Sequence, residues 1–115
     1  MPVNQQDVYD FSDCWQELDP NGNGMIHCYE LEKFIYNLAC NYPNCKLIAN
    51  KKRIKKNVTY RRKYIASLQI PSHDKFGHFK FQDTLQCMSR IVVEAAYIKT
   101  HFKEQKELST AQLKL

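Results

Sequence analysis

The segment Asp19-Pro-Asn-Gly-Asn-Gly-Met-Ile-His-Cys-Tyr-Glu30 places oxygen-bearing side chains at its first, third, fifth and twelfth positions and a glycine at its sixth. This is the spacing D-x-[DN]-x-[DN]-G-x5-E. A hard cation such as calcium takes six to eight oxygen ligands, and short side chains at alternating positions converge on it where the backbone wraps around the ion. The glycine permits the positive φ that the turn requires. The segment therefore predicts a calcium-binding loop.

Six residues of this segment are the predicted ligands. Four would bind through side-chain oxygens: Asp19, Asn21, Asn23 and Glu30. Met25 would bind through its backbone carbonyl, and His27, if it takes part, through a water molecule. Only Asp19 and Glu30 carry charge, so we expect a dissociation constant no lower than about 10⁻⁷–10⁻⁵ M. Without flanking helices, the same residues would instead form a cluster of Asx-turns, because Asn and Gly favour turns.

Apolar residues at helical spacing flank the loop on both sides. The helical patterns cover about residues 5–18, 28–39 and 59–70, and a fourth runs from near Phe81 to at least Thr100. Two helix–loop–helix units of this kind are typical of EF-hands, and each alone could not bury its apolar face. We predict an all-α fold of paired EF-hands with a short two-stranded bridge between the loops. Its parts are a first hand at about 5–40, a basic connector at 41–58, a degenerate second hand at about 59–100, and a C-terminal helical extension at 101–115.

The second loop, between the third and fourth helical patterns, lacks several oxygen donors. Phe76 falls at its fifth position and offers no side-chain oxygen, and an aspartate replaces glutamate at the twelfth. Aspartate is short for bidentate closure of the site. Phe79 falls at the eighth position, where we expect it to pair with Ile26 of the first loop. We predict that this hand is structural and that His73 and His78 are solvent-facing.

Charge is distributed unevenly along the 115 residues, whose net charge is +5. Residues 1–45 hold seven acidic side chains and one basic one, whereas residues 46–63 hold nine basic side chains and no acidic one. Leu47, Ile54 and Val58 would form the apolar face of a basic helix there. The residues predicted to meet a protein partner or anionic lipid are Lys51, Lys52, Arg53, Lys55, Lys56, Arg61, Arg62 and Lys63.

Three interpretations of this basic segment remain open. Basic amphipathic segments bind membrane surfaces or serve as calmodulin targets. A solvated connector, kept soluble by its lysines, is the alternative. Nucleic acid is a weaker interpretation, because no recognised binding motif accompanies the basic run.

The composition excludes several classes of protein. The longest uninterrupted apolar run is four residues, far short of the roughly 20 that cross a bilayer. The N-terminal residues do not form a signal peptide, so we expect a soluble chain that starts inside the cell, or a fragment of a membrane protein. Five cysteines without a C-x-x-C pattern fit reduced thiols, with a zinc site at Cys40, Cys45 and a histidine as the alternative. No phosphate loop, nucleophile elbow or metalloprotease helix is present, so we predict no enzymatic activity.

Further motifs make the chain resemble one EF-hand family in particular. They are Phe11-Ser-Asp-Cys-Trp15 and Leu18-Asp19-Pro20 in the first half, and Ile65-Ala-Ser-Leu-Gln-Ile-Pro71 and Gly77-His-Phe-Lys-Phe81 in the second. Over roughly residues 5–100 the chain resembles the cytoplasmic C-terminal EF-hand domain of voltage-gated calcium and sodium channels. It departs from that family in its intact first loop, in its longer and more basic connector, and in lacking an IQxxxR pattern.

The resemblance implies a calcium-linked regulatory module at the cytosolic face of a membrane. Such a module modulates gating through contacts with the rest of the channel polypeptide, a target helix or calmodulin, and the basic segment would hold it near the anionic inner leaflet. The alternative is a free-standing EF-hand calcium sensor or buffer that binds a target helix. Sensors usually expose a methionine-rich groove, and only Met25 and Met88 follow the initiator here.

Overall fold

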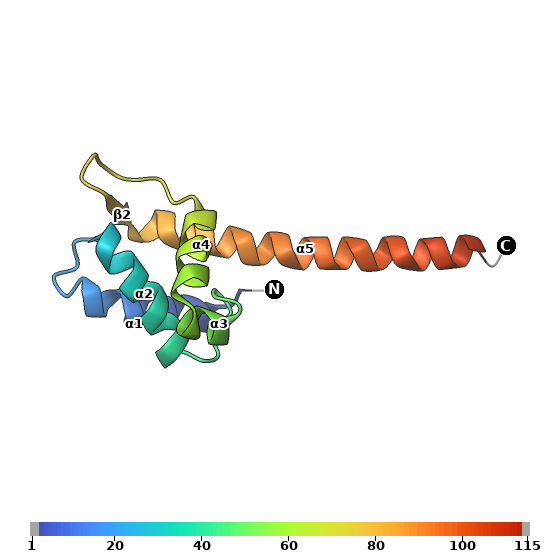
Figure 1. The fold of residues 1–115 in the computed structure, drawn as a ribbon, viewed down its shortest axis with the longest axis horizontal. Coiled ribbons are helices and arrows are strands. Elements are labelled where there is room, and N and C mark those ends of the chain that lie inside the picture. The colour runs from blue at the N-terminus through green and yellow to red at the C-terminus, as the bar shows by residue number, and fades with distance from the viewer. Residues whose placement is uncertain (1–2, 114–115) are drawn as a thin grey trace.

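The computed structural model describes the backbone of residues 3–113 and the side chains of residues 3–102. Over this range the chain is mostly helical, with one small antiparallel sheet. The elements in chain order are α1 (Gln5–Leu18), β1 (Met25–His27), α2 (Cys28–Asn41), α3 (Lys51–Lys56), α4 (Val58–Leu68), β2 (His78–Lys80) and α5 (Phe81–Leu113). In Figure 1, α1 to α4 gather around the first turns of α5, and the remainder of α5 projects from this body as a single rod.

Local sequence signals account for where the helices begin and end. Asn4 caps α1: its Oδ1 accepts a hydrogen bond from Asp7 N at 3.0 Å, and Asp7 Oδ2 accepts one from Asn4 N at 2.9 Å, which is a capping box. The predicted helix at about 5–18 is confirmed, and α2 extends two residues beyond the predicted 28–39. The predicted third helix, about 59–70, lies at Val58–Leu68, because Gln69 takes the left-handed φ of 50° and ends it.

The two loops meet through β1 and β2. Their antiparallel register pairs Ile26 with Phe79, so this predicted pairing is confirmed. Backbone hydrogen bonds flank the strands, from Cys28 N to Gly77 O at 2.8 Å and from Phe81 N to the carbonyl oxygen of the first loop's sixth residue at 2.9 Å. Because both strands lead directly into helices, the bridge fixes the starts of α2 and α5 relative to one another.

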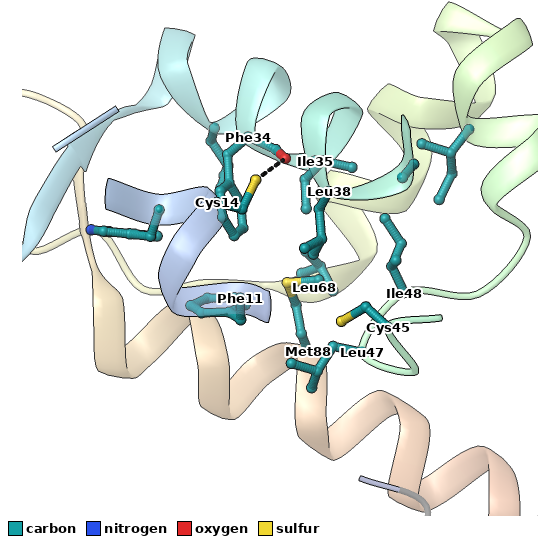
Figure 2. Packing of buried hydrophobic residues seen from close by; sticks show 14 of the residues in the cluster. Phe11, Cys14, Phe34, Ile35, Leu38, Cys45, Leu47, Ile48, Leu68 and Met88 are labelled. Carbon is teal, nitrogen blue, oxygen red and sulfur yellow. Dashed lines mark hydrogen bonds between the residues drawn. The ribbon is translucent and has the colours of Figure 1, made fainter. Parts of the chain in front are cut away.

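An aromatic cluster joins α1, α2 and α5. The ring of Phe11 lies edge-to-face with Phe34 and with Phe81, at centroid distances of 4.9 and 5.1 Å. Trp15 lies 5.4 Å from each of the same two rings. Figure 2 shows that labelled side chains from α1, α2, α4, α5 and the segment 45–48 point into one interior. The core is therefore shared by both halves of the chain.

The predicted connector is folded onto the body. Leu47 and Ile54 are fully buried. The prediction of one amphipathic helix carrying Leu47, Ile54 and Val58 is wrong, because Leu47 precedes α3 while Val58 begins α4 and is 47% exposed. The helices separate at Asn57, whose backbone is extended and whose Oδ1 accepts a hydrogen bond from Tyr60 N at 2.9 Å as the N-cap of α4.

Helix α5 continues without a break across residue 100. The boundary predicted between the second hand and the extension at 101–115 therefore falls inside one helix, while residues 114–115 and the side chains from residue 103 onward lie outside the described residues. The exposed side chains of α5 include large apolar groups, at Val93, Tyr97, Ile98 and Phe102. Within the described part of the chain, no helix is both long enough and apolar enough to traverse a membrane.

Candidate metal centre

All six residues predicted as ligands line one cleft. The cleft has a volume of about 470 Å³ and is bordered by the end of α1, the first loop, β1 and the start of α2. Its lining includes Asp19, Asn21, Asn23, Met25, His27 and Glu30. Leu18, Pro20, Ile26 and His78 complete it. The fold thus brings together the whole predicted donor set.

Asp19, at the first position of the loop, is held in place by three N–H donors. Its Oδ1 accepts a hydrogen bond from Asn23 N at 2.8 Å, and its Oδ2 accepts from Gly24 N at 2.8 Å and from Trp15 Nε1 at 3.2 Å. Gly24 has a φ of 77°, which glycine adopts without the steric cost of a Cβ atom. The loop is therefore curved around the Asp19 carboxylate, and Asp19 as a whole residue is 6% exposed.

Glu30, at the twelfth position, lies in the first turn of α2. Its Oε1 accepts a hydrogen bond from His27 N at 3.1 Å, and this contact forms half of the capping box that starts the helix. The side chain is only partly buried. The N-terminus of a helix favours a carboxylate, so the position of Glu30 beside the cleft follows from the way α2 begins.

The donor chemistry fits a hard divalent cation. Asp19 and Glu30 offer carboxylate oxygens, Asn21 and Asn23 offer amide oxygens on exposed side chains, and Met25 has a backbone carbonyl. These are the ligand types that calcium prefers, and magnesium shares them. Among the described residues, no thiol lines the cleft, and besides these oxygens its lining includes the imidazoles of His27 and His78.

His27, at the ninth position, acts as the N-cap of α2. Its Nδ1 accepts a hydrogen bond from Tyr29 N at 3.4 Å, and its ring stacks on that of Tyr29 at 4.6 Å. The ring of His78 meets His27 edge-to-face at 5.3 Å. Any contact of His27 with an ion through water stays a prediction.

His78 also lines the cleft, and sequence reasoning missed it. The prediction that it simply faces solvent is wrong, because its Nδ1 lies 2.9 Å from Asp74 Oδ2 and its side chain is 38% exposed. The predicted pairing of Ile26 with Phe79 already implies that His78 lies beside the first loop, since an antiparallel register places His27 opposite His78.

Backbone N–H groups of the second loop donate hydrogen bonds to the loop's own aspartate, Asp74. Asp74 Oδ1 accepts hydrogen bonds from Phe76 N at 2.9 Å and from His78 N at 3.3 Å. Partial desolvation raises the pKa of the Asp74 carboxyl, but these bonds and the His78 ring outweigh it, so the pKa lies below its usual value. Phe76 is 65% exposed. Asp74 thus binds within its own loop, and the loop also reaches the first hand, where Gly77 O accepts a hydrogen bond from Cys28 N at 2.8 Å.

A second group of possible metal ligands lies between α1 and the turn that follows α2. Asp7, Asp10 and Cys45 each offer an atom within 4.8 Å of the others. Both oxygens of Asp7 are already engaged, Oδ2 by Asn4 N at 2.9 Å and Oδ1 by Lys46 N at 3.0 Å. Burial raises the pKa of the Cys45 thiol, and its Sγ donates a hydrogen bond to Asp7 O at 3.6 Å. This group tethers α1 to the turn.

The predicted basic surface is only partly available to a partner. Lys51 Nζ donates a hydrogen bond to Ile48 O at 3.0 Å, and Arg62 Nε lies 3.5 Å from Glu32 Oε2 while its side chain remains 69% exposed. The exposed members of the predicted set are Lys52, Arg53, Lys55, Lys56, Arg62 and Lys63. These exposed cations, carried by α3 and α4, form the basic surface of the folded protein.

Arg61 does not belong to this surface. It is 8% exposed, and its Nε donates to Ile54 O at 2.9 Å and its NH2 to Lys55 O at 3.1 Å. Its NH1 lies 3.4 Å from Glu32 Oε1, and its guanidinium carbon lies 4.7 Å from the centroid of the Tyr36 ring. Arg61 therefore fastens α3 and α4 to α2, and sequence reasoning placed it on the surface because it stands in a run of exposed cations.

Replacing Arg61 by methionine is expected to lower the free energy of unfolding by about 1–3 kcal/mol, because the carbonyls and the carboxylate that it satisfies lose their partner. Arg62→Met is the matched control, since Arg62 pairs with the same Glu32 from an exposed position. Its expected effect is below about 0.5 kcal/mol. Urea denaturation followed by circular dichroism measures both, and equal losses would contradict the account.

Two aromatic residues of the quoted motifs lie close to the cleft without lining it. Trp15 packs in the aromatic cluster and donates to Asp19, and Phe79 closes the strand bridge. Comparisons of the chain with models of protein families, with curated proteins and with solved structures give no match. Any assignment of function therefore rests on the residues of the cleft and their surroundings.

Proposed function

We propose that this protein is a calcium-linked regulatory module of paired EF-hands, serving as the cytosolic C-terminal EF-hand domain of a voltage-gated calcium or sodium channel. The channel assignment rests on the resemblance over roughly residues 5–100, and one observation carries the calcium-linked part of the proposal. Residues at the first, third, fifth, seventh, ninth and twelfth positions of one segment line a single cleft of about 470 Å³. The pairing of Ile26 with Phe79 supports the proposal that the hands are paired, because it joins two helix–loop–helix units through their loops.

The position of Glu30 supports a regulatory role. Its carboxylate belongs to the first turn of α2 and caps that helix through His27 N. An ion held by Glu30 would thus act directly on α2, against which α3 and α4 pack. A ligand shifts an equilibrium between two arrangements only through its different affinity for them, and α2 is the element through which calcium would exert that difference.

Two features favour a module within a larger protein over a free-standing sensor. The projecting part of α5 carries exposed apolar side chains at Val93, Tyr97, Ile98 and Phe102, which suits contact with further protein surface. Met88 is fully buried in the core and Met25 lies in the cleft. Neither methionine is therefore placed to form the exposed methionine-rich groove that is typical of promiscuous sensors.

Calorimetric titration of the full chain with calcium, with magnesium present at a cellular level, tests the proposal. We expect one site with a dissociation constant within or above about 10⁻⁷–10⁻⁵ M, because only two of the ligands are charged. The absence of binding up to millimolar calcium would overturn the calcium-linked role.

A further inference from the structure

A hollow on the basic surface is lined mainly by cations. It has a volume of about 520 Å³, and its lining is Asn50, Lys52, Arg53, Lys56 and Asn57. Lys52 and Lys56 stand four residues apart on α3, so they project from the same side of the helix. No acidic side chain lines the hollow, and the two asparagines bring polar groups to its rim.

The charges in the hollow are uncompensated. Among residues 3–102, neither Lys52, Arg53 nor Lys56 forms an ion pair with an acidic side chain. Glu32, the acidic residue that does pair with this part of the chain, is engaged by Arg61 and Arg62. Clustered like charges raise the local potential and attract ligands of the opposite charge. The hollow is therefore suited to a multiply charged anion.

Tyr60 holds the polar groups of the hollow in place. The guanidinium carbon of Arg53 lies 4.2 Å from the centroid of the Tyr60 ring, and Tyr60 Oη accepts a hydrogen bond from Asn50 Nδ2 at 2.9 Å. Asn57 Oδ1 accepts from Tyr60 N at 2.9 Å. A guanidinium that is already oriented can bind a phosphate group through two parallel hydrogen bonds with little further ordering.

We propose that this hollow binds the phosphorylated inositol headgroup of a membrane phosphoinositide. The surroundings favour a lipid over a soluble polyphosphate. Val58 follows the lining residue Asn57 and is 47% exposed, which suits the apolar boundary of a bilayer. The same two helices carry further exposed cations outside the hollow, at Lys55, Arg62 and Lys63, and a charged bilayer attracts such additional cations whereas a small solute in the hollow does not reach them. The proposal does not depend on calcium.

Binding of the full chain to lipid vesicles in a calcium chelator tests the proposal. The vesicles contain phosphatidylcholine with either phosphatidylinositol bisphosphate or phosphatidylserine, at equal total charge. We expect at least about tenfold tighter binding to the phosphoinositide vesicles, because bidentate contacts add to general attraction. The triple variant Lys52→Gln, Arg53→Gln, Lys56→Gln is expected to bind them about a hundredfold more weakly, at about fivefold for each cation.

Two further variants separate the hollow from net charge. Lys33→Gln, Lys75→Gln, Lys99→Gln removes the same charge from exposed positions that do not line the hollow, and it is expected to weaken binding by no more than about twofold, because distant charges are screened. Arg53→Lys keeps the charge but loses the planar fork. It is expected to reduce the preference for phosphoinositide about fivefold.

Several results would overturn the proposal. These are equal binding to the two kinds of vesicle, equal losses in the two triple variants, tighter binding to an RNA oligonucleotide than to vesicles, or binding of free inositol hexakisphosphate without vesicle binding. Because calcium is absent throughout, each of these results leaves the metal centre untouched.

Discussion

Replacing Phe11 by alanine is expected to lower the free energy of unfolding by about 3–5 kcal/mol. Phe11 is fully buried and contacts three other rings, those of Trp15, Phe34 and Phe81. These rings come from three helices, so a cavity at Phe11 cannot close by the movement of a single element. A loss of this size would consume much of the roughly 5–15 kcal/mol by which a domain is usually stable.

Phe76→Ala is the matched control for that variant, because the Phe76 side chain is 65% exposed in the second loop. Its expected effect lies within about 0.5 kcal/mol of zero. Urea denaturation followed by Trp15 fluorescence and by circular dichroism measures both variants. A loss below about 1 kcal/mol for Phe11→Ala, or comparable losses for the two, would contradict the described core.

Replacing Glu30 by glutamine is expected to weaken calcium binding roughly a hundredfold, because it removes one of two charged ligands and the oxygen pair that would close the site. The side-chain oxygen of glutamine can still accept a hydrogen bond from His27 N, as Glu30 Oε1 does at 3.1 Å. The cap of α2 is therefore retained, and the free energy of unfolding without calcium should change by less than about 0.5 kcal/mol.

Glu94→Gln provides the control for the loss of one acidic charge. Glu94 is exposed on α5, where it lies 3.9 Å from Arg90, and its variant should bind calcium as the unmodified chain does. Calorimetric titration of each variant with calcium measures the two affinities. Unchanged calcium affinity in Glu30→Gln would show that Glu30 is not a ligand. A large loss of stability without calcium would show that Glu30 serves mainly to cap α2.

The first loop and the helices beside it could be predicted because their signals are local. The six predicted ligands stand within twelve consecutive residues, and the fold brings them to one cleft. The pairing of Ile26 with Phe79 followed from the loop positions of the two residues. A capping box at the start of α1, formed by Asn4 and Asp7, likewise uses residues three apart.

The packing of the connector could not be predicted, because it depends on contacts between distant residues. Arg61 meets Glu32 across 29 residues, and Cys45 Sγ donates to Asp7 O across 38. A segment with nine cations and no acidic residue, such as 46–63, predicts an exposed stretch, yet the fold buries Arg61 and leaves its neighbour Arg62 in solvent. Charge alone does not reveal which cation faces the core.

Luminescence of bound terbium tests the central claim, that the cleft holds a calcium ion, most directly. The chain has one tryptophan, and Trp15 Nε1 lies 3.2 Å from Asp19 Oδ2. Terbium takes oxygen ligands as calcium does, and it emits when an excited indole lies close by. We expect emission on excitation of Trp15, displaced by calcium and lost in Glu30→Gln. A lack of sensitised emission at saturating terbium, or emission that calcium leaves unchanged, would contradict the account.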